Sequence, residues 1–510
     1  MKQQYLLGVD IGTYESKGVI VTADGHIISS HARPHNLSIP RQGWAEHDSE
    51  TVWWDDFCAI VKELLQESGV SAYDIIAVGC SAIGPDMLPV DNKGRGLRPA
   101  VLYGIDTRAT AEIESLERAF GRADIFARCG NYLSAQSAGP KMLWLKNHEP
   151  EVYNRAHKLV TGTSFLVARL TGNYWVDHYT AAAGFTPLYD TRTAGWADDL
   201  CEPIVNPAKL PDIAWTTDIA GTVTGAAAAE TGLAPGTPVI VGTCDAAAEA
   251  VSVGVVAPGQ LMLMYGSTAF FVEVIDRSII DERLWAAPYL FRDTYCLTAG
   301  MSTAGSLTRW FRDVLGPDLV GAEKNTGANA YETLARGAAL VAPGADGLLV
   351  LPYFSGERTP INDPKARGVF FGLTLAHTRE HLYRAVLEGI GHGIKHHLDI
   401  LKQIAAAPER IIAVGGGTKN PLWLQIVSDI CGQTQEVPAV TFGASYGDAF
   451  LAGLGAGTFA SYRDISSWIQ NGRQVSPQPA NAGIYEKQHE IYLNLYTQNK
   501  EFMHRLTELI

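Results

Sequence analysis

The sequence predicts an α/β protein built from two related halves, and three observations lead to this prediction. Apolar runs typical of strands alternate with segments whose apolar residues recur at helical spacing. A strand–turn–strand pattern at residues 5–22 returns in similar form at residues 260–274. The chain has 510 residues, enough for two or three domains with sizeable cores. We therefore expect an N-terminal domain over residues 1–253 and a C-terminal domain over residues 254–510.

The chain opens with a predicted antiparallel meander. Residues 5–12 form an apolar run that only Asp10 interrupts, and residues 17–22 and 26–31 supply two more strands. Ala23-Asp24-Gly25 lies between the last two strands, and Asp-Gly suits the positive φ angles of a tight hairpin turn. The meander disfavours a Rossmann start, in which the first strand leads directly into a helix.

Helices and buried strands follow the meander. Ser49 can cap a helix that runs to about Glu67 and stops at Gly69, and residues 74–83 and 99–105 read as strands. Later segments continue this alternation: a helix over 379–403, a strand over 410–414, a helix from Asn420-Pro421 to Gly432, and a polar packing helix over about 484–510.

Composition and charge exclude several classes of protein. Forty Lys and Arg against 54 Asp and Glu give a net charge of −14, so the surface should repel nucleic acids and anionic membranes. A hydrophobic share of 46% is too high for a disordered chain, yet no stretch approaches 18 uninterrupted apolar residues. We expect a cytoplasmic protein without nucleic-acid or membrane partners.

The cysteine and histidine patterns give little indication of a disulfide, catalytic or metal site. The seven Cys are scattered singly without a C-x-x-C pair, so buried free thiols are expected. His392 and His396 have a spacing that can bind a metal on a helix, but Gly393 follows the first where a catalytic Glu would stand. We interpret this pair as part of a solvated face.

Two turns between strands can bind phosphate. Gly12-Thr13 and Gly266-Ser267-Thr268 offer backbone N–H groups and hydroxyls, and glycine lets a phosphate chain approach the backbone closely. Each turn taken alone is also compatible with a plain hairpin. Asp10, just before the first turn, is a hard oxygen ligand that can hold Mg²⁺ beside such phosphates, or a carboxylate satisfied by backbone N–H groups.

Two further segments have both a structural and a chemical interpretation. Gly415-Gly416-Gly417, between a strand and a helix, would let a base or ribose lie against the backbone, although the G-x-G-x-x-G spacing is missing. Asp245 lies among small residues at a strand-to-helix junction and is either a helix cap or a catalytic base. Its local sequence favours the cap.

Taken together, these motifs resemble the FGGY family of carbohydrate kinases, within the actin-like and hexokinase-like ATPases, and most of all its xylulose kinase branch. Residues 7–17 match the first phosphate segment and residues 43–54 the following Trp/Glu/Asp segment. Gly368 to Glu388 fits the C-terminal signature without a gap, and Ser355 to Pro360 matches the segment before it. Pro140 to His148 matches the N-terminal signature less closely.

The resemblance implies two ribonuclease-H-like domains with a cleft between them, ATP and Mg²⁺ as cofactors, and a small-molecule sugar as substrate. It assigns Mg²⁺ to Asp10 and the catalytic base to Asp245, which reverses the local preference for a cap. It also assigns the nucleotide to two sets of residues: Gly12, Thr13, Gly266, Ser267 and Thr268 at the phosphates, and Gly415, Gly416, Gly417 and Asn420 at the adenosine. Closure on binding and a homodimer are further expectations that the resemblance carries.

The sugar pocket departs from the family pattern. Xylulose kinases carry Gln-Met-His-Gly where this chain has Ile83-Gly84-Pro85-Asp86, and Asn where it has Ala246. Losing two hydroxyl partners weakens the assignment of xylulose, because unpaired sugar hydroxyls cost affinity. Asp86 and Asp106 are the candidates for binding sugar hydroxyls, together with Asp245.

Three functions follow from these motifs. The first is an ATP-dependent kinase for a ketopentose, or for a related polyol, ketotetrose or sugar acid. The second is a non-catalytic sugar or nucleotide sensor of the same fold, which the retained Asp10, Thr13 and Asp245 disfavour. The third is an actin-like or chaperone-like ATPase, which the signature over 368–388 disfavours.

Overall fold

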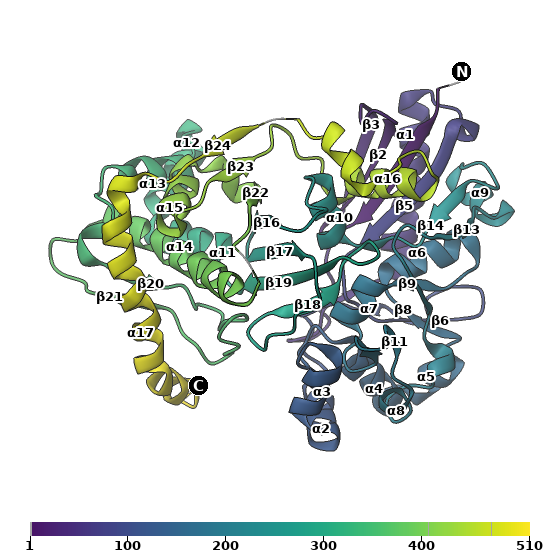
Figure 1. Cartoon of the computed structure of the whole chain (residues 1–510), viewed down its shortest axis with the longest axis horizontal. Helices are drawn as coiled ribbons and strands as arrows, with labels where there is room; N and C mark the ends of the chain where they lie inside the picture. Colours follow the sequence, from purple (N-terminus) through teal and green to yellow (C-terminus); the bar gives the residue numbers. More distant parts are fainter. Residues whose placement is uncertain (1–2, 406, 471, 510) are drawn as a thin grey trace. The chain divides into compact units, whose positions relative to one another are not determined.

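The computed structural model describes residues 3–405, 407–470 and 472–509, and the chain divides into two compact units (Figure 1). The first unit comprises Met1–Pro258, Val274–Cys296 and Thr441–Gln470. The second comprises Gly259–Glu273, Leu297–Val440 and Asn471–Ile510. Each unit is therefore assembled from segments that are distant in sequence.

The first unit is built on a mixed sheet with the strand order β13-β14-β5-β1-β2-β3. Its strands are β1 (Tyr5–Ile11), β2 (Glu15–Thr22), β3 (Ile27–Pro34), β5 (Ile75–Ala82), β13 (Ile219–Thr222), β14 (Pro238–Ile240) and β15 (Thr243–Cys244), which pairs with β5. Both β1–β2 and β2–β3 are antiparallel, and Gly25 adopts a φ of 81° between the last two. The predicted meander and its hairpin turn are confirmed.

Helices and short strand pairs surround this sheet. The helices are α1 (Asp55–Ser68), α2 (Thr110–Phe120), α3 (Arg122–Cys129), α4 (Ala138–His148), α5 (Pro150–Arg155), α6 (Gly162–Thr171), α7 (His178–Gly184), α8 (Asp198–Cys201), α9 (Gly225–Thr231), α10 (Asp245–Ser252) and α16 (Ala444–Gly455). The short strands form four pairs: β4 (Glu46–His47) with β7 (Ala100–Val101), β6 (Leu88–Val90) with β8 (Lys158–Val160), β9 (Trp175–Asp177) with β12 (Asp212–Ala214), and β10 (Tyr189–Asp190) with β11 (Gly195–Trp196). Strand β18 (Trp285–Pro288) belongs to none of these pairs. Apolar side chains of β1, β5, α1 and α6 form the core.

Within the second unit, six strands of a seven-stranded mixed sheet follow the order β19-β17-β16-β22-β23-β24. Its strands are β16 (Gln260–Tyr265), β17 (Ala269–Ile275), β19 (Tyr295–Met301), β22 (Arg410–Val414), β23 (Gln435–Val437), β24 (Arg473–Val475), and a separate pair β20 (Leu349–Leu351) and β21 (Val369–Phe371). Its helices are α11 (Gly305–Leu315), α12 (Pro317–Thr326), α13 (Ala330–Ala339), α14 (Arg379–Ile404), α15 (Pro421–Cys431) and α17 (Ala482–Thr507).

The two sheets repeat one topology. In the first, β1 pairs antiparallel with β2 and parallel with β5, β5 pairs parallel with β14, and β14 pairs antiparallel with β13. In the second, β16 pairs antiparallel with β17 and parallel with β22, β22 pairs parallel with β23, and β23 pairs antiparallel with β24. The echo of residues 5–22 at 260–274 therefore marks two copies of one arrangement.

Helix α16 brings a distant part of the chain onto the first sheet. In Figure 1 this yellow-green helix lies beside the purple strands of the meander. It packs on β1 and β5 at two glycines: a Cβ on Gly8 would lie 1.9 Å from the Ser445 carbonyl oxygen, and one on Gly79 would lie 2.2 Å from that of Asp448. Real Cβ atoms do not approach so closely, so this contact requires glycine at both strand positions.

Several predicted elements match the structure closely. The helix predicted over 379–403 is α14, the strand over 410–414 is β22, and the helix after Asn420 is α15. The Asn420 side chain accepts a hydrogen bond from the Trp423 N–H, and Gly432 ends α15 with a φ of 64°. The sequence signals for caps and stops are confirmed here.

Three local predictions are wrong. Asp48, not Ser49, caps the first helical segment, because its carboxylate accepts from the N–H groups of Glu50 and Thr51. The strand predicted over 99–105 shortens to Ala100–Val101. His392 is fully buried and its ring stacks on that of His489, because α14 is covered on several sides; it does not lie on a solvated face.

The structure also bears on the thiols and on membranes. All seven Cys are free, and all but the partly exposed Cys431 are buried, as expected. Within the described ranges, no helix combines the length and the apolar character that a membrane span requires.

We predict that Gly79→Ala lowers the melting temperature, because the new methyl group collides with the backbone of α16. Overpacking of this kind costs about 1–3 kcal/mol. The control is Gly225→Ala at the start of α9, where an added Cβ meets nothing within 4 Å. Calorimetric melting of both variants checks this, and equal melting temperatures would contradict the packing described for α16.

Candidate active site

Several acidic side chains of the first unit lie together at the carboxyl ends of the central strands of its sheet. Strands β1, β5 and β15 are mutually parallel, and Ser81 of β5 is in register with Asp10 of β1 and with Thr243 of β15. Asp245 follows β15 directly as the first residue of α10, and Asp448 reaches the same place from α16. Carboxyl ends of parallel strands are a common location for ligand sites.

Ser81 joins two of these carboxylates. Its hydroxyl lies 2.9 Å from Asp10 Oδ1 and 2.7 Å from Asp448 Oδ2. Ser81 and Asp448 are fully buried, whereas Asp10 is partly exposed. The array therefore has a buried end at Asp448 and an accessible end at Asp10.

Asp245 does not cap the helix that it begins. The cap position of α10 is Cys244, and Asp245 Oδ1 accepts a hydrogen bond from the N–H of Ala246 at 2.7 Å. The side chain is partly exposed, so a carboxylate oxygen is accessible at the positive end of the helix. This position suits a proton acceptor better than the cap that the local sequence favours.

Mutual repulsion and burial raise the pKa values throughout this cluster. Burial raises the pKa of Asp10 to about 6, although the Ser81 hydroxyl and Lys17 oppose the shift. Burial and the charge of Asp10 hold the pKa of Asp245 well above its usual range, and the same two causes raise the pKa of Glu249, one helical turn later, to about 7. Groups that bind protons this tightly mark a candidate site for proton transfer.

The residues present fit Mg²⁺ only if water and phosphate oxygens supply most of its ligands. Within the described ranges, no three His, Cys, Asp or Glu side chains are placed to hold a metal together. Mg²⁺ is usually bound by one or two carboxylates, with water and phosphate oxygens completing its octahedron. Asp10, a partly exposed carboxylate among other acidic side chains, matches that requirement.

The first predicted phosphate turn lies beside this cluster. The Gly12 N–H donates to the Glu15 carbonyl oxygen at 3.0 Å, which closes the turn between β1 and β2. The Thr13 hydroxyl lies 3.0 Å from the Tyr103 hydroxyl. Gly12 and Thr13 are both partly exposed, so the turn is accessible from solvent.

The second predicted turn lies in the second unit, where it connects β16 to β17. Its carbonyl groups are held by the start of α11, because the Gly305 N–H donates to Gly266 O and the Ala304 and Ser306 N–H groups donate to Ser267 O. Ser267 is exposed, and Gly266 and Thr268 are partly exposed. The turn is thus fixed in place at the first turn of a helix.

The glycine segment of the second unit also has a fixed shape. Gly415 adopts a φ of 90°, and a Cβ there would lie 2.8 Å from the Tyr265 carbonyl oxygen. Gly415 and Gly416 are exposed, and Gly417 is partly exposed. This segment presents bare backbone to solvent next to Asn420, whose side chain caps α15.

The two predicted sugar ligands have different environments. Asp86 is fully buried; its Oδ1 accepts from the Gly162 N–H at 2.9 Å, and its Oδ2 has no hydrogen-bond partner among the described residues. Burial raises the pKa of Asp86 to about 7, and the charge of the buried Lys141 opposes this. Asp106 is instead saturated: it accepts from the Ala45 N–H at 2.7 Å and from the Arg108 guanidinium.

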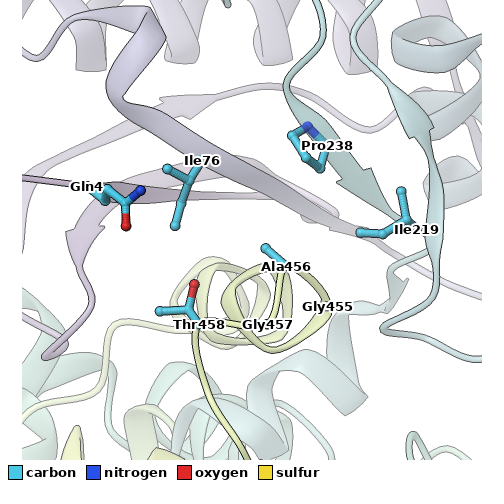
Figure 2. A pocket seen from close by; sticks show the side chains of 8 residues that line it. All are labelled: Gln4, Ile76, Ile219, Pro238, Gly455, Ala456, Gly457 and Thr458. Atoms are coloured by element: carbon cyan, nitrogen blue, oxygen red, sulfur yellow. The ribbon is translucent and has the colours of Figure 1, made fainter.

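A cavity of about 610 Å³ lies at the other end of the strands (Figure 2). Gln4, Ile76 and Pro238, at the amino ends of β1, β5 and β14, line it with residues 455–458 at the end of α16. Asp10 and Ser81 lie at the carboxyl ends of β1 and β5, so this cavity is separate from the acidic cluster.

Sequence reasoning missed Ser81, Glu249 and Asp448. Ser81 looks like an ordinary end of a buried strand until strand register places it beside Asp10. Asp448 had one visible signal: it is a lone carboxylate in the apolar helix over 444–455. Its distance of 367 residues from Ser81 hides the contact from any local pattern.

We predict that Asp10→Asn raises the melting temperature at pH 7.5 in the presence of EDTA. The pKa of Asp10 is about 6 in the folded protein and 3.8 in the reference state, so its ionisation costs stability as pH rises between those values. The gain should disappear at pH 3.5, where the carboxyl is neutral in both states.

Glu151→Gln, at an exposed carboxylate on α5, is the matched control for this melting experiment and should show no such gain. A lower melting temperature for Asp10→Asn at pH 7.5 would show that the cluster does not repel the Asp10 charge.

Comparison with known proteins places these features in one family. Residues 5–252 match the model of the "FGGY family of carbohydrate kinases, N-terminal domain", and residues 261–456 match its C-terminal domain. Xylulose kinase of Staphylococcus xylosus is 28% identical over 498 residues, covering 96% of this chain and 99% of the relative. Gluconokinase of Bacillus subtilis is 25% identical over 513 residues, covering 98% and 99%.

The solved structures agree with the sequence relatives. The crystal structure of xylulose kinase from Rhodospirillum rubrum has a TM-score of 0.91 and 31% identity, covering 98% of this chain and 100% of that one. The predicted fold, two domains of the type found in actin-like and hexokinase-like ATPases, is thereby confirmed. The chain belongs to the FGGY family of carbohydrate kinases and is an ATP-dependent sugar kinase.

Proposed function

We propose that this kinase transfers the γ-phosphoryl group of ATP to a hydroxyl of a ketopentose, with Asp245 as the catalytic base. The observation that carries the proposal is the position of Asp245, partly exposed at the first turn of α10 and close enough to Asp10 for the Asp10 charge to raise its pKa. Similarity to xylulose kinases over nearly the whole chain supports a ketopentose as the acceptor.

A sugar hydroxyl is a poor nucleophile, and Asp245 activates it by accepting its proton. A carboxylate within hydrogen-bond reach takes the hydroxyl proton as the new P–O bond forms. Its tendency to bind a proton is increased because burial and the Asp10 charge raise its pKa. The proton moves from the sugar oxygen to Asp245, the γ-phosphoryl group moves from ATP to that oxygen, and ADP is the leaving group.

The phosphate turns supply alignment and neutralise charge. Phosphoryl transfer depends mostly on positioning and on electrostatic stabilisation, and backbone N–H groups and hydroxyls at a fixed turn provide both. We assign this role to Thr13 in the first unit and to Ser267 and Thr268 in the second, with Gly415 to Gly417 and Asn420 beside the adenosine. Mg²⁺, when bound, would be held at Asp10 and would neutralise phosphate charge.

The acidic character of the first unit favours a neutral sugar. Similarity to gluconokinase makes a sugar acid the second candidate. However, the charge of Asp10 already raises the pKa values of Asp245 and Glu249, and an anionic substrate beside the same carboxyl groups would add a further like charge that costs binding energy. Asp86 Oδ2, which has no hydrogen-bond partner among the described residues, can accept a hydrogen bond from a sugar hydroxyl. Asp86 is therefore a better candidate for binding the sugar than Asp106, whose carboxylate already accepts hydrogen bonds from Ala45 and Arg108.

We predict that Asp245→Asn lowers the kcat of sugar-dependent ADP formation by about 10²–10⁴-fold, because the amide cannot accept the proton. Calorimetric titration should find ATP binding within about twofold of the wild type, since the nucleotide residues are unchanged. Asp198→Asn, at an exposed carboxylate on α8, is the control and should keep full activity. Near-normal turnover by Asp245→Asn would remove the base assignment.

We further predict that xylulose or another ketopentose gives the highest kcat/KM in a panel of ketopentoses, ketotetroses, polyols, glycerol and sugar acids. ADP release with Mg-ATP is the measurement. A gluconate response that exceeds every ketose would establish the second candidate. ATP binding with no response to any acceptor would favour the non-catalytic sensor.

A further inference from the structure

The contacts of Ser81 require one more proton than a serine carries. Its hydroxyl has a single proton, yet its oxygen is within hydrogen-bond distance of two carboxyl groups, Asp10 and Asp448. If both carboxyls were ionised, one of the two contacts would bring together two oxygens without a proton between them. A neutral carboxyl that donates to Ser81 Oγ satisfies both contacts, whereas two ionised carboxylates would have to share the one Ser81 proton.

The surroundings identify Asp448 as the neutral partner. Asp448 is 0% exposed, and its second oxygen, Oδ1, has no hydrogen-bond partner within the described ranges. An ionised carboxylate in that position would leave buried charge without compensation. Asp10 is partly exposed and has the cation Lys17 nearby, so the negative charge is better placed there.

We propose that Asp448 is a positioning residue: as a neutral carboxylic acid it donates to Ser81 Oγ, and so directs the Ser81 proton onto Asp10 Oδ1. The consequence for catalysis rests on the proposed function, because Asp10 matters for turnover only if it serves phosphoryl transfer. The chain Asp448–Ser81–Asp10 then fixes the orientation of one Asp10 oxygen and leaves Oδ2 available to a ligand.

Charges that face Asp448 from the neighbouring elements act in the same direction. Burial and the charge of Asp10 on β1 raise the pKa of Asp448 well above its usual range, and Asp245 on α10 adds to the effect. The hydrogen bond with Ser81 on β5 opposes it. Packing holds the geometry, because α16 lies directly on Gly79 at the Asp448 carbonyl oxygen.

The test compares an amide with a methyl group at position 448. In Asp448→Asn the amide N–H can replace the carboxylic O–H as donor to Ser81, so kcat should stay within about twofold of the wild type. Asp448→Ala removes the donor, and loss of an outer partner of this kind costs about 10–100-fold in activity. The loss should fall on kcat, with the sugar KM unchanged.

Ser81→Ala completes a double-mutant cycle. It should lower kcat as Asp448→Ala does, and Asp448→Ala added to Ser81→Ala should cost nothing further, because residues in one chain are not additive. Ser445→Ala is the matched control: it removes a buried hydroxyl, without a hydrogen-bond partner in the described part of the chain, from the same helix. It should keep full activity.

An infrared spectrum tests the proton without turnover. At pH 7.5, with no substrate present, the wild type minus Asp448→Asn difference should contain the C=O stretch of a protonated carboxylic acid, and Ser81→Ala should shift that band. If the wild type phosphorylates no sugar, the proposed function fails while this measurement still decides the state of Asp448.

Two results would overturn the proposal. One is an Asp448→Asn variant that folds but loses as much kcat as Asp448→Ala, since that would mean the negative charge is required. The other is a difference spectrum that contains only carboxylate bands.

Discussion

Acidic side chains are concentrated at the carboxyl ends of the central strands of the first sheet, where the charge of Lys17 only partly opposes the raised pKa values of Asp10 and Glu249. Burial raises the pKa values of Asp10, Asp245, Glu249 and Asp448, and the charge of Asp10 raises the other three further. A protein designed for stability alone would not gather these groups. A kinase benefits from them, because a carboxylate that binds protons tightly accepts one from a sugar hydroxyl, and because carboxylate oxygens attract a divalent cation.

Two structural devices keep this cluster in place. Parallel pairing of β1, β5 and β15 puts Asp10, Ser81 and Thr243 side by side, and Asp245 follows two residues after Thr243. The glycines of β1 and β5 then let α16 rest against the strands, so that its carboxylate reaches Ser81. The second unit repeats the strand topology but carries the turn at Gly266 to Thr268 and exposed glycine backbone instead of the acidic cluster. One arrangement of strands thus positions two different sets of residues.

Much of the fold could be predicted from the sequence, because local signals determine it. The meander, the cap at Asn420 and the stop at Gly432 depend on neighbouring residues. The cap at Asp48 was misjudged because Ser and Asp both cap helices and the two are adjacent. The burial of His392 and the Ser81–Asp448 contact depend on tertiary packing, which no local pattern records. The roles of Asp245 and of the nucleotide residues came from family resemblance, and they remain proposals.

The central claim is that the first unit activates a sugar hydroxyl for attack on ATP. Phosphorus-31 NMR of a reaction with Mg-ATP and xylulose tests it most directly, because the spectrum identifies the product that receives the phosphoryl group. We expect the γ-phosphate signal to be replaced, mole for mole, by a single phosphomonoester signal. Release of inorganic phosphate alone would mean that water is the acceptor, and would contradict activation of a sugar hydroxyl by the first unit.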